Sequence, residues 1–245
     1  MSKIQRDSEA FETMWLDPGH PTPYGSYQEL YDDIRAFFYK HVEFRKDIIY
    51  DVMTCWTIAT WRQDILKVFA YMFFLGPMNS GKTRAIECLL ATCFRAILAP
   101  SMSISAVFRA IEKWGVTLLI DESQIYSKDD FAEMIAILNA GYRRGQKVFR
   151  TVPNAEGDFD IKGFKVYGPK ALDAKAPPTE TLFGRSFVVY MQKNRRKMPR
   201  DIDEKWATRI RSKLNYLHYK PENLTYSTEA DLDTIPDNRL AELFS

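Results

Sequence analysis

An eight-residue segment of the chain has the residue types that bind phosphate groups. It reads GPMNSGKT, from Gly76 to Thr83, and fits the pattern G-x-x-x-x-G-K-[ST] at every fixed position. The glycines let the backbone bend so that its N–H groups face an anion. In this pattern the lysine, here Lys82, reaches the β and γ phosphates, and the hydroxyl of Thr83 is a magnesium ligand.

The segment therefore predicts a site for ATP and Mg²⁺. The residues that we expect to contact the nucleotide are Gly76, Pro77, Met78, Asn79, Ser80, Gly81, Lys82, Thr83 and Arg84. Residues 68–75, VFAYMFFL, form a continuous apolar run that is typical of a buried parallel strand, and residues 84–94 have helical spacing. The alternative interpretation is a glycine turn with an incidental Gly-Lys-Thr. It is disfavoured because the strand and the helix would also have to be there by accident.

Two carboxylates follow a second apolar run. Residues 116–120 predict a buried strand, and Asp121 and Glu122 come directly after it. We expect Asp121 to hold the magnesium shell and Glu122 to act as the general base that polarises water. An ordinary acidic pair at a strand end is the alternative. A base beside a metal ligand favours hydrolysis over transfer to a metabolite, for which the sequence shows no acceptor pocket.

The remaining pattern alternates helices and strands. We predict helices at 27–40, from 48 to 59, and at 103–114, 129–140 and 202–217, short strands at 96–98, 165–172 and 187–191, a helical turn at 179–185, and a hairpin or extended insertion at 147–164. This order indicates an α/β three-layer P-loop NTPase core with a mostly parallel sheet, N-terminal helices and a small C-terminal helical extension. The expected divisions are a flexible tail at 1–26, a helical lead-in at 27–66, the core at 67–192, and an extension with an acidic tail at 193–245.

Composition sets only broad limits. The formal net charge of +2 and the pI near 8.3 neither require nor exclude a nucleic-acid partner. The three cysteines show neither C-x-x-C spacing nor an even count, so we expect reduced, buried thiols and no zinc site. The N-terminus lacks the apolar core of a signal peptide, and no run reaches the roughly 20 apolar residues of a membrane span, so we expect a soluble, cytoplasmic protein.

From about Ile48 to Asn194, the ordered motifs resemble those of AAA+-type helicase-related ATPases found in replication proteins of plasmids, phages and integrated elements. The motifs that carry the resemblance are GPMNSGKTR, LLIDES, LNAGYRRG, VYGPKALDA and TLFGRSFVVYM. The first motif is common to all P-loop proteins, whereas the ordered set is much more specific. The resemblance implies an AAA+-like fold and a homo-oligomer, usually a hexameric ring, with ATP between subunits.

In such rings, one subunit supplies an arginine to the γ-phosphate of its neighbour, and this resemblance implies Arg185 as the first candidate for a trans-acting catalytic role. The alternative for Arg185 is a salt bridge that fastens the strand end. Arg143 and Arg144 compete for the role, with a solvated helix end as their alternative. The family also has a polar sensor residue at the end of the strand before the arginine. Here that strand offers Lys170 and Asp173, and the choice between them stays open.

Two basic segments are candidates for nucleic-acid contact. Residues 143–150, RRGQKVFR, open the predicted insertion, where ring translocases present pore loops, so Lys147, Phe149 and Arg150 are possible contacts by analogy. Residues 193–200, KNRRKMPR, add five cations, and solvated surface charge is the alternative for both segments. We therefore expect an ATP-hydrolysing oligomeric motor that acts on single-stranded or duplex DNA during replication of a mobile genetic element. An ATP-dependent switch or assembly factor acting on a protein partner is the alternative.

Overall fold

The centre of the molecule is a five-stranded parallel sheet. The computed structural model describes residues 14–99, 102–121, 128–154, 156–175 and 177–220, and the side chains of 128–131 lie outside this description. Across the sheet the order is β2-β3-β6-β1-β7. The bounds are β2 Ala96–Leu98, β3 Thr117–Asp121, β6 Lys170–Ala174, β1 Tyr71–Leu75 and β7 Ser186–Tyr190. The predicted α/β core with a mostly parallel sheet is confirmed.

Strand β1 lies inside the sheet, between β6 and β7. All five of its residues are buried, as the apolar run in the sequence predicts for a strand covered on both faces. Phe74 of β1 is paired with Asp173 of β6, and Asp173 is paired in turn with Asp121 of β3. Because parallel strands end at the same edge of a sheet, the loop after β1 and these two carboxylates lie at one edge.

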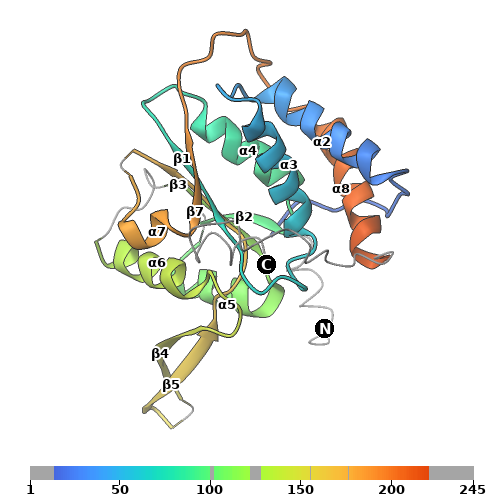
Figure 1. Ribbon diagram of the computed structural model, residues 1–245. Helices are drawn as coiled ribbons and strands as arrows, with labels where there is room; N and C mark the ends of the chain where they lie inside the picture. The colour runs from blue at the N-terminus through green and yellow to red at the C-terminus, as the bar shows by residue number, and fades with distance from the viewer. Residues whose placement is uncertain (1–13, 100–101, 122–127, 155, 176, 221–245) are drawn as a thin grey trace, which may run out of the picture.

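Four helices cover one face of the sheet (Figure 1): α2 Tyr27–His41, α3 Ile48–Thr60, α4 Lys82–Thr92 and α8 Glu204–Tyr219. Helix α2 begins with a capping box, in which Ser26 and Glu29 satisfy each other's backbone N–H groups. Each helix contributes fully buried side chains to a single hydrophobic cluster, including Leu30, Met53, Leu89 and Leu214. The predicted lead-in and C-terminal extension thus share a core with the helix that follows the P-loop.

Three helices lie on the opposite face: α5 Ile104–Trp114, α6 Lys128–Ala140 and α7 Glu180–Phe183. In α5 the apolar positions predicted from helical spacing, Val107, Phe108 and Ile111, are buried against the sheet. Burying one such side chain contributes about 1.5–3 kcal/mol. Ser103 caps the helix by accepting a hydrogen bond from the backbone N–H of Ala106, and Gly115 ends it in the left-handed conformation.

An antiparallel ribbon, consisting of β4 Lys147–Pro153 and β5 Phe159–Lys165, extends away from the sheet (Figure 1). It agrees with the hairpin predicted at 147–164. Val148 is paired with Phe164, and this side of the ribbon packs against α5 and α6. Residues directly opposite each other share a face, so Phe149 and Gly163 form part of the other, outer face.

Two expectations need correction. The strand predicted at 165–172 is wrong, because Lys165 ends β5 and the sheet strand β6 begins only at Lys170. Gly168, with a φ of 147°, and Pro169 lie between the two strands and interrupt them. Cys55 is exposed, unlike the buried Cys88 and Cys93, because it lies on the outer side of α3.

The end of the predicted N-terminal tail lies along α8. Arg211 donates a hydrogen bond to the carbonyl oxygen of Asp17, and Asn215 donates to that of Gly19, each at 2.8 Å. The backbone N–H of Thr22 donates to the carbonyl oxygen of Ser212 at 3.1 Å. In the part of the chain that the structure describes, no helix is both long and apolar enough to cross a membrane.

Candidate nucleotide-binding site

The loop between β1 and α4 has the backbone shape of an anion-binding turn. Asn79 has a φ of 60° and Gly81 a φ of 87°, so left-handed residues alternate within the loop. Such alternation directs successive N–H groups toward one point, as a phosphate requires. A Cβ at Gly76 would lie 2.4 Å from the carbonyl oxygen of Met191, so only glycine fits there. The buried hydroxyl of Ser80 has no hydrogen-bond partner among the described residues. These features fit a bound phosphate chain.

The Lys82 ammonium lies across this loop. Its Nζ donates hydrogen bonds to the carbonyl oxygens of Gly76, at 2.8 Å, and Pro77, at 3.1 Å. It also lies 3.6 Å from Oδ1 of Asp173, and both side chains are 9% exposed. A cation held at the mouth of the loop is placed to neutralise phosphate charge.

Thr83 and two aspartates complete the site. The Thr83 hydroxyl donates to Oδ2 of Asp173 at 3.3 Å, and Asp121 is the cross-strand neighbour of Asp173. Burial raises the pKa of Asp173, the Lys82 ammonium opposes that rise, and the nearby Asp121 carboxylate adds to it. Two carboxylates beside a hydroxyl are hard oxygen donors of the kind that Mg²⁺ prefers.

The structure places Lys82, Thr83 and Asp121 at the same edge of the sheet, each next to Asp173. Among the described residues, no group of three or more His, Cys, Asp or Glu side chains could hold a metal ion. Magnesium is usually bound by one or two carboxylates together with substrate phosphates, so a complete protein cage is not required. Glu122, the predicted base, lies outside the described residues.

The two sensor candidates lie at opposite ends of β6. Asp173 contacts the P-loop, whereas Lys170 begins the strand and is paired with Leu118 at the start of β3. The Lys170 ammonium donates to three main-chain carbonyl groups, at Val166, Gly168 and Gly141. Lys170 therefore lies away from the loop, and of the two only Asp173 is in position to contact a nucleotide bound there.

The three arginine candidates lie at the amino end of the sheet, opposite the P-loop. Arg185 precedes β7, and its guanidinium donates to the carbonyl oxygen of Asn139 at 2.8 Å and lies 5.2 Å from the centre of the Tyr142 ring. Arg144 donates to the carbonyl oxygen of Leu66 at 3.1 Å. The backbone of Arg143 pairs with Val68. At about 3.3 Å per residue, β1 separates these arginines from the loop of their own chain by more than about 10 Å.

The segment after β7 contributes residues that the sequence did not single out. Asn194 lies beside the loop, with its Oδ1 3.5 Å from the position that a Cβ on Gly81 would take. Glu43 holds the segment in place by accepting hydrogen bonds from the backbone N–H groups of Arg195, at 2.6 Å, and Arg196, at 2.8 Å. The basic run 193–200 indicated charge, but nothing in its pattern indicated proximity to the P-loop.

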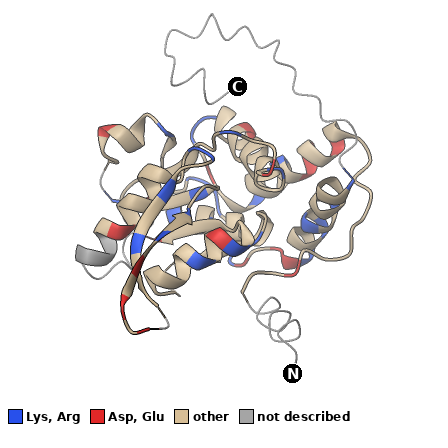
Figure 2. Ribbon diagram, turned by 90° about the horizontal axis from the view of Figure 1, so that it is seen from below, with Lys and Arg blue, Asp and Glu red and all other residues tan. Residues whose placement is uncertain are grey.

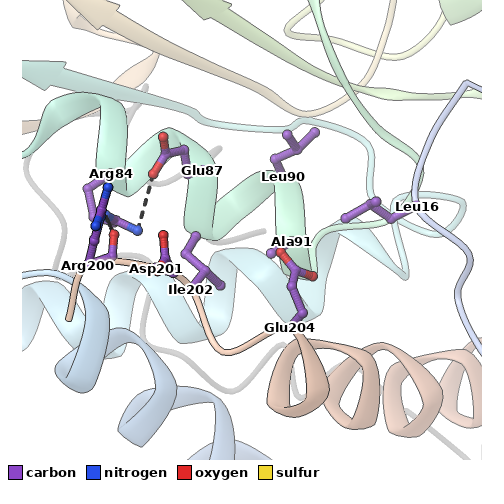
Figure 3. Close-up of a pocket in the computed structure, with 9 residues that line it drawn as sticks. All are labelled: Leu16, Arg84, Glu87, Leu90, Ala91, Arg200, Asp201, Ile202 and Glu204. Atoms are coloured by element: carbon purple, nitrogen blue, oxygen red, sulfur yellow. Dashed lines mark hydrogen bonds and ion pairs between the residues drawn. The ribbon is translucent and has the colours of Figure 1, made fainter.

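A crevice of about 360 Å³ continues from this region along α4 (Figure 3). At one end, Arg84 forms an ion pair with Glu87 at 3.4 Å and donates to the carbonyl oxygen of Arg200 at 2.6 Å. Leu16 lies at the other end, and Leu90 and Ile202 supply apolar wall between them. The crevice therefore begins one residue after Thr83, and it offers both apolar and charged groups to a ligand.

The three predicted nucleic-acid contacts lie on different faces of the ribbon. Lys147 and Phe149 lie on its outer face, and Phe149 is 70% exposed. Arg150 is turned toward the helices instead, where it forms an ion pair with Glu133 and lies 4.7 Å from the centre of the Phe108 ring. Of the three residues predicted to contact nucleic acid, Lys147 and Phe149 therefore share one surface, and Arg150 does not belong to it. Figure 2 shows basic residues on the part of the ribbon that is next to the core and acidic residues toward its tip.

This arrangement defines the fold. A P-loop follows β1, a strand inside a parallel sheet. Asp121 is the last residue of β3, and β6 lies between β3 and β1. The chain has an α/β P-loop core. No protein-family model and no curated protein matches the sequence.

Solved structures that are similar to this chain at a low level include the two described next. One is the structure of C. elegans PCH-2, with 14% identity, a TM-score of 0.39, and coverage of 65% of this chain and 46% of that chain. The other is the JCV helicase, solved with a bound acetamide compound, with 15% identity, a TM-score of 0.39, and coverage of 79% and 54%. This chain thus spans about half the length of each.

Proposed function

We propose that this protein binds and hydrolyses ATP at the P-loop. The observation that carries the proposal is the meeting of Lys82, Thr83 and the Asp121–Asp173 pair at the carboxyl ends of three neighbouring strands. A phosphate chain in the loop would accept hydrogen bonds from the N–H groups of the left-handed turn and from the Lys82 ammonium. The buried Ser80 hydroxyl supplies one more donor to the same loop.

Thr83 and Asp121 would hold Mg²⁺, which neutralises charge on the β and γ phosphates. Asp173 is a second carboxylate within reach of the same position, because it contacts both Lys82 and Thr83. Glu122 follows Asp121 directly and is our candidate for the base that orients the attacking water. The nucleoside would lie in the crevice beside Arg84, where Leu90 and Ile202 can cover its base.

We propose that turnover requires a homo-oligomer, with a hexameric ring as the expected form. Arg185 lies at the end of the sheet opposite its own P-loop, so it can reach a γ-phosphate only in a neighbouring subunit. A cation there would stabilise charge that develops during phosphoryl transfer. Arg143 and Arg144 remain alternatives at the same end.

We propose DNA as the substrate on which the motor acts, in replication of a mobile genetic element. The outer face of the ribbon carries Lys147 beside Lys165, and Phe149 beside Gly163. Two adjacent cations suit a phosphate backbone, and an exposed aromatic ring suits base stacking. The inner cations are neutralised, since Lys162 pairs with Glu112 at 3.3 Å and Arg150 pairs with Glu133.

One observation favours a second function, an ATP-dependent switch that binds a protein partner. The outer face of the ribbon is largely apolar, with Phe149 70%, Phe159 66% and Ile161 78% exposed. Such an apolar stripe suits a protein surface at least as well as a nucleic acid. The acidic residues toward the ribbon tip would repel a phosphate backbone there.

The deciding experiment measures ATP hydrolysis by the wild type and Glu122→Gln over a range of protein concentrations, with and without single-stranded DNA. Turnover that rises with both concentration and DNA, and weakens with salt, supports the ring motor. Turnover that ignores DNA but responds to a partner protein supports the switch. Absence of ATP binding by the wild type would reject both proposals, and normal turnover in Glu122→Gln would reject Glu122 as the base.

A further inference from the structure

Lys170 is a buried lysine for which the proposed hydrolysis chemistry gives no role. Its side chain is 1% exposed, and burial lowers its pKa to about 7. The Nζ donates to the carbonyl oxygens of Val166 at 2.8 Å, Gly168 at 2.9 Å and Gly141 at 3.4 Å. An ammonium group has three N–H donors, so this arrangement provides an acceptor for each.

These three carbonyl groups belong to the two chain segments that connect the ribbon to the core. We call residues 141–146 and 166–169 the ribbon root. Gly141 lies between α6 and β4, whereas Val166 and Gly168 follow β5. A Cβ on Gly141 would lie 2.4 Å from both the Lys170 Nζ and the Val166 carbonyl oxygen. Lys170 therefore joins both segments of the root, and the glycine permits this close approach.

The root is also fastened to the segment before β1. The backbone N–H of Phe69 donates to the carbonyl oxygen of Tyr142, and that of Arg144 donates to the carbonyl oxygen of Lys67, each at 2.9 Å. The Tyr167 hydroxyl donates to the carbonyl oxygen of Leu66 at 2.7 Å. These hydrogen bonds hold the root against the chain that leads into β1.

The strand that Lys170 begins ends at the nucleotide site. Three residues later, roughly 10 Å along β6, Asp173 contacts Lys82 and Thr83. Phosphates and magnesium would engage the same lysine and the same hydroxyl, so nucleotide binding changes the contacts at this end of β6. A change in the position of β6 reaches the ribbon root through the Lys170 ammonium.

We infer that Lys170 is a positioning residue that couples the nucleotide site to the ribbon. The inference rests on the proposed binding of ATP at the P-loop, but not on DNA as the substrate. The coupling runs from Asp173, along β6, through the Lys170 ammonium to Gly141 and Val166. The conformation of the ribbon then depends on the bound nucleotide, whichever partner it contacts.

Hydrogen exchange in the full chain tests the coupling. Backbone exchange of the ribbon, residues 147–165, is measured with no nucleotide and with a non-hydrolysable ATP analogue, and nucleotide affinity is measured in parallel. We expect the analogue to change ribbon exchange severalfold in the wild type. In Lys170→Met, whose side chain is of similar length but has no donors, we expect that change to be lost while affinity is retained. Lys67→Met, which replaces an exposed lysine beside the root, is the matched control.

Two further variants separate coupling from packing. Lys170→Arg keeps a cationic donor and should retain part of the nucleotide-dependent change that Lys170→Met loses. Gly141→Ala leaves the lysine in place but crowds its Nζ, so it should reduce the change even if Lys170→Met does not fold. A full nucleotide response of the ribbon in folded Lys170→Met or Gly141→Ala would overturn the inference, as would a wild-type ribbon that ignores bound nucleotide. A wild type that binds no nucleotide is a separate result, which rejects the proposed function itself.

Discussion

The two ends of the central sheet differ in how their polar groups are satisfied. At the carboxyl end, Ser80 is buried with no partner among the described residues, and Asp121 and Asp173 lie side by side. At the amino end, the Lys170 ammonium and the Tyr167 hydroxyl are matched to main-chain carbonyl groups. Polar groups left without partners cost free energy unless a ligand satisfies them. The carboxyl end therefore offers groups to a ligand, and the amino end holds the two segments of the ribbon root together.

The largest effect is expected from Arg185, at the amino end. Arg185→Ala should lower ATP turnover by about 10³-fold or more, because a trans-acting arginine stabilises transition-state charge. Mixing Arg185→Ala with Lys82→Ala should recover part of the activity, since mixed oligomers contain some interfaces with an intact loop and an intact arginine. Steady-state turnover of the mixtures is the measurement, and Arg209→Ala, an exposed arginine on α8, is the control. Full activity in Arg185→Ala would transfer the role to Arg143 or Arg144.

At the carboxyl end, Glu122→Gln should lower turnover by about 10²–10⁴-fold, the range for removal of a general base. ATP affinity should be retained, because an amide has nearly the same size as a carboxylate and the loop is unaltered. Equilibrium binding and single-turnover hydrolysis separate the two effects. Equal losses of ATP binding and turnover would show that Glu122 supports the structure of the site and is not the base that orients the attacking water.

Lys82→Ala should weaken both ATP binding and turnover, with a loss of about 10²–10³-fold in turnover, because it removes the cation that is held across the loop. Titration with a fluorescent ATP analogue provides the affinity. Lys67→Ala, at the amino end of the sheet, should leave the affinity unchanged. If the two substitutions lowered ATP affinity equally, ATP binding would not be a property of the carboxyl end of the sheet alone.

The smallest effect is a pH dependence of stability that originates at the amino end. The folded-state pKa of Lys170 is about 7, below the ordinary value of about 10.4, so above pH 7 the unfolded state binds more protons. The free energy of unfolding of the wild type, relative to Lys170→Met, should therefore rise with pH between pH 7 and 10, by at most on the order of 1 kcal/mol per unit. Denaturant unfolding at several pH values measures it. If the difference in unfolding free energy does not change with pH, the carbonyl groups and the Tyr71 ring keep the Lys170 ammonium charged.

Local sequence predicted much of the nucleotide site. The strand, loop and helix around Lys82 are contiguous, so their geometry follows from glycine positions and hydrophobic periodicity over a short stretch of chain. The ribbon was predicted for the same reason, since its two strands are neighbours in sequence. The start of β6 was missed because the apolar pattern of 165–172 continues across a turn at Gly168.

These local patterns could not predict contacts between segments that are far apart in the sequence. Asn194 meets Gly81 because β7 ends beside the loop. Arg150 lies opposite Glu133 of α6 because side chains alternate along β4 and the Val148 side of the ribbon packs against the helices. A basic run in the sequence shows charge without showing which face of a strand each residue takes once the partner strand is in register.

By itself, the sequence determined the phosphate-binding loop, the acidic strand end and the alternation of elements, because each depends on backbone geometry within a few residues. Only the tertiary structure decided that Asp173 lies beside Lys82 and Thr83, that Lys170 bonds to the ribbon root, and that Arg185 lies at the opposite end from its own loop. The physical reason is the parallel sheet: its strand order places the two ends of each strand in different environments, and that order is set by packing across the whole core.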